Sequence, residues 1–311
     1  MYWITVATTC GNADLPCSFT LGEISKLNRD ASTALATIRE WMNSLVLINR
    51  VPLDVLSLIP THLPYQEDRF RATFVCRHWR RTFLQIATLW SHLHLSKGKA
   101  YVEAILKRTK SSPLSVLASD ADPVGTVELL LPHTKQIADL KSTNNYWADA
   151  QRFLYLDSEP LPLLRTLKID IAQEITADDL EVMTAPSQPL FSGAVDLKEF
   201  RSRSVGLPLL SHFVFPNLTS FDLWATSAEL FCGAQLLNFL EASPMLQAVR
   251  VKIVGTLSLE GVPRERVVVL RYVENLCLAA SDGGPVYELA THISCPSVKN
   301  TSLTYMGEGG S

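Results

Sequence analysis

The first hydrophobic pattern along the chain has a helical period and covers residues 21–48. Thr20 and Glu23 have the spacing of a capping box, in which each side chain accepts a backbone N–H at the start of a helix. Behind them, apolar residues recur at alternating steps of three and four, as in a heptad seam. The seam consists of Ile24, Leu27, Ala31, Ala34, Ile38, Trp41 and Leu45. We expect a leading amphipathic helix, which either packs against its own protein or pairs with a second copy.

A second helical pattern covers residues 49–95 and is interrupted by prolines. Pro52 suits the first turn of a helix, and Asp54 favours the positive end of the helix dipole. Pro60 stops or kinks this helix because its ring clashes with the preceding turn. A further helix is expected over residues 68–86. Its apolar stripe consists of Phe70, Phe74, Val75, Trp79, Phe83 and Ile86.

Five arginines accompany this stripe and mostly fall outside it, which predicts a wide aromatic face and a basic back. They are Arg69, Arg71, Arg77, Arg80 and Arg81. A solvated basic face explains such charges, and no nucleic-acid-binding motif accompanies them. Two or three short helices bury little surface alone, so a neighbour inside or outside the chain must complete their apolar face.

A third pattern, Leu-x-x-Leu-x-Leu with substitutions, recurs through residues 96–306, its first copy starting just before them. The nine copies start at Trp90, Leu114, Ile137, Leu164, Leu197, Leu218, Leu246, Val273 and Val298. Leucine-rich repeats have a similar period of about 20–29 residues. Each unit is interpreted as a short strand and a helical return, for example residues 177–184 and 228–242. The whole chain is therefore expected to be α/β, a helical module followed by an irregular leucine-rich-repeat-like solenoid; an ordinary α/β domain with coincidental leucine spacing is the alternative.

Composition narrows the class of protein. Apolar residues make up 47% of the 311 residues and the net charge is −3, so we expect a folded chain that as a whole does not bind polyanions. Residues 1–20 and 307–311 are expected to be flexible ends. No apolar run reaches the roughly 20 residues of a membrane helix, and the beginning of the chain does not resemble a secretory signal. The six cysteines form no CxxC motif and favour a reducing compartment.

Candidate catalytic residues are few, and a structural interpretation is preferred for each. His92 and His94 point to the same side of a strand, but no third metal ligand lies near them in the sequence. Cys76 stands beside Arg77 and His78, as an activated thiolate would, yet core packing explains it better. Asp120 and Asp122 are interpreted as turn residues, not as catalytic carboxylates.

The order and spacing of residues over positions 50–93 resemble the F-box, the helical module that docks on the Skp-type adaptor of SCF ubiquitin ligases. The matching residues are Val51, Pro52, Asp54, Val55, Leu58, Ile59, Leu63, Pro64, Val75, Cys76, Arg77, Trp79, Leu89 and Trp90. Pro60 departs from the pattern, because F-boxes usually carry a large apolar residue there. The layout of leading helix, F-box and degenerate leucine-rich tail also resembles fungal F-box proteins.

The resemblance implies a substrate receptor that is not itself an enzyme. The F-box would bind the Skp-type adaptor and through it the cullin scaffold, and the repeat array would hold an unknown protein substrate on its concave face. The residues implied in adaptor binding are Pro52, Leu53, Val55, Leu58, Ile59, Leu63, Pro64, Val75, Cys76, Trp79, Leu89 and Trp90. Trp79 and Trp90, with aliphatic neighbours, are expected to form an apolar surface that only another helical protein covers.

The same interpretation implies no metal, cofactor, nucleic acid or membrane partner, and a cytoplasmic or nuclear location. The alternative function is a leucine-rich-repeat interaction scaffold that has no link to a ligase and self-associates through its leading helix.

Overall fold

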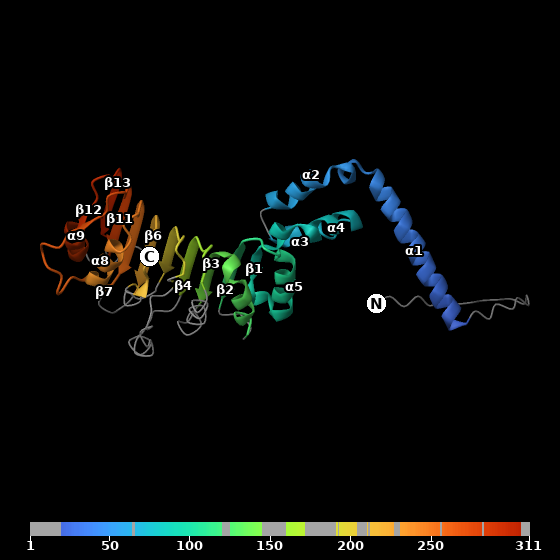
Figure 1. Ribbon diagram of the computed structural model, residues 1–311, viewed down its shortest axis with the longest axis horizontal. Helices are drawn as coiled ribbons and strands as arrows, with labels where there is room; N and C mark the ends of the chain where they lie inside the picture. The colour runs from blue at the N-terminus through green and yellow to red at the C-terminus, as the bar shows by residue number, and fades with distance from the viewer. Residues whose placement is uncertain are drawn as a thin grey trace, which may run out of the picture. The chain divides into compact units, whose positions relative to one another are not determined.

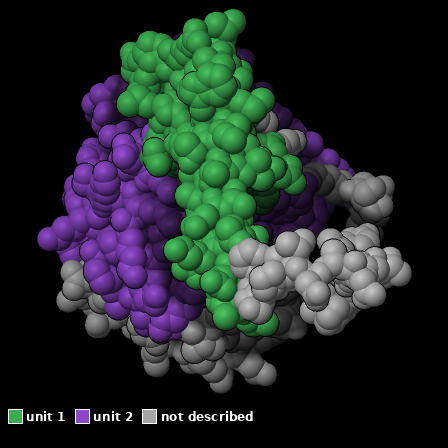
Figure 2. All heavy atoms as spheres, turned by 90° about the vertical axis from the view of Figure 1, so that its right-hand side faces the viewer, with its two compact units in different colours: residues 1–83 green, residues 84–311 purple. Residues whose placement is uncertain are grey.

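The computed structural model describes most of the chain. The described residues are 20–63, 66–119, 125–144, 160–171, 191, 193–203, 210, 212–226, 231–255, 257–281 and 283–305. The chain divides into two compact units, residues 1–83 and residues 84–311 (Figure 2). Both predicted flexible ends lie outside the described residues, except for Thr20.

The first unit is built from helices. They are α1 (Leu21–Leu45), a 3-10 turn at Leu47–Arg50, α2 (Leu53–Leu58), a 3-10 turn at Ile59–His62, α3 (Gln66–Ala72) and α4 (Arg77–Gln85), whose last residues belong to the second unit. The capping box is present: the Thr20 hydroxyl accepts the backbone N–H of Glu23 at 3.3 Å, and the Glu23 carboxylate accepts that of Thr20 at 2.8 Å. α1 is therefore fixed at its start by local bonds. None of its 25 residues is buried.

The single helix expected over residues 68–86 is wrong. The structure has two helices, α3 and α4, separated at residues 73–76. In this segment the N–H groups of Thr73, Phe74 and Val75 bond three residues back instead of four. The Thr73 hydroxyl also bonds the carbonyl of Phe70 at 2.7 Å, which competes with the helical ladder. β-Branched Thr and Val lose side-chain freedom in a helix, which adds to the cost of continuing it.

The helix before Pro60 ends as expected. α2 stops at Leu58, and the chain passes through a 3-10 turn that contains the buried Pro60. Pro52 is the residue before the first turn and not within it, while Asp54 lies in the first turn. α2 is thus limited to six residues, with Pro52 directly before it and Pro60 in the turn that follows it.

The described part of the second unit contains a nine-stranded sheet in which every neighbouring pair is parallel (Figure 1). The strands lie in the order of the chain, so each one adds to the edge formed by the previous one. They are β1 (His92–His94), β2 (Leu114–Ser119), β3 (Ile137–Asn144), β4 (Thr166–Ile171), β5 (Glu199–Arg203), β6 (Ser220–Thr226), β8 (Ala248–Val254), β11 (Asn275–Ala280) and β13 (Asn300–Tyr305).

Helices and short strands connect the described parts of the sheet. The helical segments are 3-10 turns at Ala87–Trp90, Leu95–Lys97 and Glu128–Gln136, α5 (Lys99–Thr109), α8 (Gly233–Glu241) and α9 (Gly283–Thr291). The short strands are β7 (Phe231–Cys232), which pairs with β9 (Leu257–Ser258), and β10 (Val268–Val269), which pairs with β12 (Ile293–Ser294). The described part of the chain contains no helix long and apolar enough to cross a membrane.

One face of the sheet forms the core of this unit. Side chains alternate along a strand, and in β6 the residues Phe221, Leu223 and Ala225 are buried while their neighbours are partly exposed. Phe200 of β5 contacts Phe221 at a ring distance of 6.0 Å, and Phe239 of α8 lies 4.6 Å from Phe221. α8 therefore packs on the buried face of the sheet, while the opposite face, which we call the open face, is partly exposed in β6.

All nine predicted leucine motifs coincide with the nine strands of the sheet. The predicted helical returns agree less well with the structure. In the described part of the segment expected over residues 228–242, residues 231–232 pair with β9 as a strand and the helix begins at Gly233; residues 228–230 lie outside the described residues. The return expected at residues 177–184 and the turn residues Asp120 and Asp122 lie outside the described residues.

Candidate docking surface on the helical unit

α2 presents apolar side chains to solvent. Leu53, Val55 and Leu58 are 58%, 48% and 54% exposed, although each has an aliphatic side chain. Leu56 is fully buried and anchors the helix to its unit. A helix of six residues with one buried side chain gains little from its own fold, so its exposed apolar side chains are available to another molecule.

The break between α3 and α4 exposes two more apolar residues. Phe74 is 72% exposed and Val75 is 61% exposed. The Arg80 guanidinium lies 5.6 Å from the centre of the Phe74 ring, within the range of a cation–π contact. Because a continuous helix would have turned these residues toward its apolar stripe, the break creates this exposed surface. We call Leu53, Val55, Leu58, Phe74 and Val75 the apolar surface.

Trp79 is held inside the unit by a specific hydrogen bond. Its indole N–H donates to Asn49 Oδ1 at 2.7 Å, and its ring meets that of Phe83 edge-on at 5.3 Å. The Asn49 side chain in turn donates to the carbonyl of Asn43, at the end of α1, at 2.6 Å. Cys76 Sγ also faces Asn49 Oδ1, at 3.9 Å. Asn49 therefore links α1 to α4, and the half-buried Trp79 shapes this unit from within.

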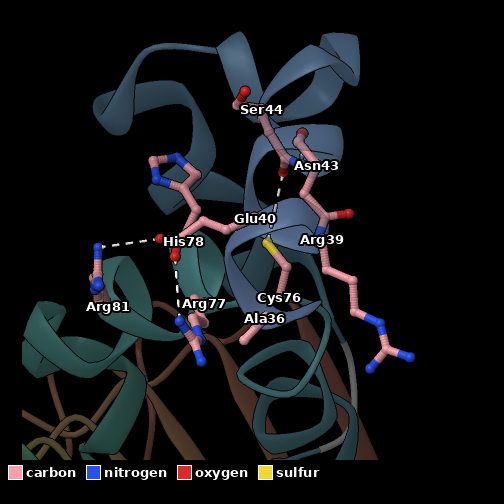
Figure 3. A pocket seen from close by; sticks show the side chains of 10 residues that line it. Ala36, Arg39, Glu40, Asn43, Ser44, Cys76, Arg77, His78 and Arg81 are labelled. Carbon is pink, nitrogen blue, oxygen red and sulfur yellow. Dashed lines mark hydrogen bonds and ion pairs between the residues drawn. The ribbon is translucent and has the colours of Figure 1, made fainter. Parts of the chain in front are cut away.

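A basic pocket lies between α1 and the start of α4 (Figure 3). It has a volume of about 410 Å³ and includes Arg39, Arg77 and Arg81 in its lining. Glu40 pairs with Arg77 at 3.3 Å and with Arg81 at 3.5 Å. Ion pairs as exposed as these contribute at most about 1 kcal/mol each. One carboxylate among three guanidinium groups leaves the pocket positive, which suits an acidic side chain of a partner.

Leu89 and Trp90 occupy a different environment from the one expected. They are 3% and 4% exposed, and the Arg108 guanidinium of α5 lies 5.1 Å from the Trp90 ring centre. Both belong to the second unit, where the 3-10 turn that carries them packs on α5. The expectation of one apolar surface built on two tryptophans is therefore wrong, because Trp90 is covered by its own chain. In this conformation Leu89 and Trp90 shape the protein and do not offer their side chains to a partner.

The remaining residues implied by the resemblance have intermediate positions. Pro52 is exposed, and Ile59, Leu63 and Cys76 are half-buried. Pro64 lies outside the described residues. Sequence reasoning did not include Phe74 among the adaptor-binding residues, because it placed Phe74 in the apolar stripe of one continuous helix. The β-branched residues on both sides of it, Thr73 and Val75, were the available signal for a break.

The exposed side chains of α2 and of the α3–α4 break are the feature of this unit that is relevant to binding. Among the described residues there is no group of three or more His, Cys, Asp or Glu side chains placed to hold a metal ion. His92 and His94 belong to the second unit, where they lie in the strand β1, as the sequence indicated. The described side chains that face solvent in α2 and in the α3–α4 break are mainly aliphatic or aromatic, and contiguous exposed apolar patches often mark interaction sites.

Comparison with protein families identifies this region. Residues 48–96 match the F-box-like family, so the chain carries an F-box-like domain that contains α2, α3, α4 and β1. F-box domains in general bind Skp-type adaptors and serve substrate receptors of SCF-type ligases. The comparison with curated proteins gave no match.

Proposed function

We propose that this protein is a substrate receptor of an SCF-type ubiquitin ligase and is not itself an enzyme. The F-box-like domain binds the Skp-type adaptor, and the adaptor joins the protein to a cullin scaffold. The strand array behind it acts as a degenerate leucine-rich-repeat solenoid, of the kind seen in fungal F-box proteins, and holds a target protein. The ligase then works by raising the effective concentration of the ubiquitin-carrying enzyme near the target's lysines. Such a receptor works in the cytoplasm or nucleus.

The observation that carries the proposal is the apolar surface inside the matched domain. Its five side chains, which are aliphatic or aromatic, are between 48% and 72% exposed. Interface energy concentrates in a few such side chains, and truncating one costs about 2 kcal/mol or more when it is fully covered by the partner. Exposed apolar groups of this size are stabilised when a partner removes them from water.

The direct test is an adaptor pull-down with a surface variant. Leu58→Ser combined with Phe74→Ser removes apolar area without touching the buried Leu56. We expect adaptor binding to fall by about a hundredfold or more, since each replaced side chain contributes about 2 kcal/mol. Pro52→Ala with Leu53→Ala is expected to abolish the pull-down as well.

The matched control replaces equally exposed valines of the second unit, Val195→Ser with Val267→Ser; these are 55% and 49% exposed. This control should bind the adaptor like the wild type. Wild-type binding by the Leu58 and Phe74 variant, with an unchanged far-ultraviolet circular dichroism spectrum, would refute the docking surface.

The alternative function, a scaffold that self-associates, is favoured by one observation: every residue of the α1 heptad seam is exposed. Co-purification separates the two functions, because a scaffold brings down a second copy without adaptor or cullin. Ile38→Glu places a charge in the seam and should cause a dimer formed through α1 to dissociate. If the protein is monomeric at all concentrations in sedimentation experiments, the scaffold alternative loses its support.

A further inference from the structure

We propose that the open face of the sheet, at β5, β6 and β8, binds an acidic segment of the target protein. The inference rests on the proposed function, because it names the chemistry of the target that the strand array would hold. It comes from six side chains, which we call the Trp224 block. They are Arg201, Arg203, Asp222, Trp224, Arg250 and Lys252.

The parallel register places these side chains in two rows across three neighbouring strands. Asp222 lies between Arg201 and Arg250 in the first row. Trp224 lies between Arg203 and Lys252 in the second row. All six alternate with core residues such as Phe221 and Leu223, so they share the face opposite the buried core.

The cations of the block are held in position by contacts within it. Asp222 Oδ2 lies 3.1 Å from Arg201 Nε and 3.6 Å from Arg250 Nη1. Lys252 Nζ lies 4.0 Å from the centre of the Trp224 ring, and the Arg203 guanidinium lies 5.0 Å from it. Both distances are within the range of a cation–π interaction. The positive groups are therefore ordered before any partner arrives, which lowers the entropy lost on binding.

The block carries more positive than negative charge. Its four cations face one carboxylate, Asp222, which already pairs with two of them. The adjacent Lys168 and Glu199 neutralise each other at 3.0 Å. Asp170, the strand neighbour of Arg203, reduces the surplus without removing it. A positive surplus on a chain whose net charge is −3 is a local feature, and a carboxylate ligand complements it.

A groove that includes the first row of the block can hold the segment. It has a volume of about 380 Å³ and crosses the starts of β5, β6, β8, β11 and β13. Its polar lining includes Arg201, Asp222, Arg250, Asn275, Asn300 and Ser302. The Asn300 amide donates to Asn275 Oδ1 at 2.8 Å, which leaves further amide hydrogens for a peptide backbone. The groove thus offers hydrogen bonds beside the charges.

An acidic protein segment fits this site better than a nucleic acid. Asp222 stands in the middle of the cations, where it would repel a continuous phosphate backbone. Two carboxylates can instead reach the outer cations on either side of Trp224, which lie two strands apart, or roughly 9.5 Å. In an extended segment, acidic residues two or three positions apart span roughly 7–10 Å. The target segment should therefore contain two acidic residues at that spacing.

Fluorescence anisotropy with the full-length protein tests this. The probes are labelled Gly/Ser peptides that carry two glutamates one to five positions apart, each with a glutamine counterpart, and a labelled single-stranded oligonucleotide. We expect the glutamate peptides spaced by two or three positions to bind at least tenfold more tightly than their glutamine counterparts. Binding should weaken between about 50 mM and about 500 mM salt, because salt screens exposed charges.

Arg203→Gln combined with Lys252→Gln should weaken peptide binding at least tenfold, whereas the charge-conserving pair Arg203→Lys with Lys252→Arg should retain most of it. Arg264→Gln with Arg271→Gln removes two exposed charges elsewhere in the same unit and should leave binding unchanged. The proposal is overturned if no glutamate peptide outbinds its glutamine counterpart, if the block variant binds like the wild type, or if the oligonucleotide binds more tightly than every peptide. Adaptor pull-down with the Arg203→Gln and Lys252→Gln variant is a separate readout of the proposed function. If this variant no longer binds the adaptor, the proposed function is called into question. If it still binds the adaptor, a failed peptide test contradicts only the proposed role of the Trp224 block.

Discussion

The helices α1 and α8 are both amphipathic, yet they differ in how much of their apolar face is buried. α8 has nine residues and buries five of them, including Leu236 and Phe239, against the sheet. α1 has 25 residues and buries none. The periodic pattern in each helix predicts an apolar face, but it does not indicate whether the same chain or another molecule covers that face. The difference teaches that the second unit completes its own core, while the first unit leaves apolar surface for others.

The same contrast holds for single residues of one type. Phe200 is fully buried, and its ring centre lies 5.1–6.0 Å from those of Phe213, Phe215, Phe221 and Phe239. Phe74 is 72% exposed and contacts one guanidinium. One phenylalanine stabilises the fold, and the other is available for binding.

The largest expected effect comes from replacing each of these two phenylalanines with alanine. Phe200→Ala should lower the free energy of unfolding of the second unit by about 3–5 kcal/mol, because it removes buried contacts and leaves a cavity. Phe74→Ala should change the free energy of unfolding of the first unit by less than about 0.5 kcal/mol. Urea unfolding followed by tryptophan fluorescence measures both. Adaptor pull-down should show the reverse order, with Phe74→Ala the more damaging for each folded molecule.

Equal destabilisation by the two alanine variants would break the comparison, since it would mean that Phe74 is covered by its own chain in solution. Leu276→Met, a nearly volume-conserving change in the core of the second unit, controls for the sensitivity of the measurement and should cost less than about 1.5 kcal/mol.

A smaller effect is expected from the link between α1 and α4. Trp79→Phe removes the N–H that Asn49 Oδ1 accepts, and Asn49→Ala removes the acceptor. Each should lower the stability of the first unit by about 1 kcal/mol, the net value of a typical hydrogen bond, with an added packing loss for the smaller ring. A double-mutant cycle on thermal unfolding isolates the pair, and its coupling energy should be about 1 kcal/mol. A coupling energy of zero would show that Trp79 is held by packing alone.

Adaptor binding by Trp79→Phe sharpens the comparison further. Because Trp79 shapes the unit from within, this variant should bind the adaptor less than tenfold more weakly, unlike the variants of the apolar surface. If Trp79→Phe weakens adaptor binding as much as Leu58→Ser with Phe74→Ser does, Trp79 belongs to the interface itself.

Much of the second unit could be predicted from the sequence because its pattern is repeated. Motifs such as Leu218-Phe221-Leu223 coincide with the strands, since an alternating apolar pattern fits a strand with one buried face. The capping box of α1 was also readable, because Thr20 and Glu23 interact locally. Features set by local chemistry or by repetition were predictable.

The rest depends on contacts between distant residues. Trp90 matched the F-box pattern and is buried against α5, and no local signal separates an exposed docking position from a covered one. Phe74 fitted a helical stripe, but the hydroxyl of Thr73 bonds the carbonyl of Phe70 and the helix ends there. The Trp224 block was invisible in the sequence, because its members come from three strands whose register only the folded sheet fixes.

The smallest expected effect concerns the start of α1 and its response to pH. Two hydrogen bonds from Thr20, one from its backbone and one from its hydroxyl, lower the pKa of Glu23 below its ordinary value of 4.5. A carboxyl group whose pKa is lowered by folding contributes stability above its unfolded pKa and loses it as pH falls through the folded value. The first turn of α1 should therefore loosen as pH falls below about 4.5, the ordinary value.

The Cα chemical shifts of residues 21–24, recorded from pH 6 to pH 3 on the full chain, measure this loosening. Glu23→Gln keeps a hydrogen-bond acceptor without the charge, so its shifts should stay nearly constant over this range. The start of α8 should not respond, because no side-chain cap bond holds it and its stability comes from packing on the sheet. Equal shift changes at both helix starts would mean that acid loosens the whole protein, and α1 would then owe its structure to packing, as α8 does.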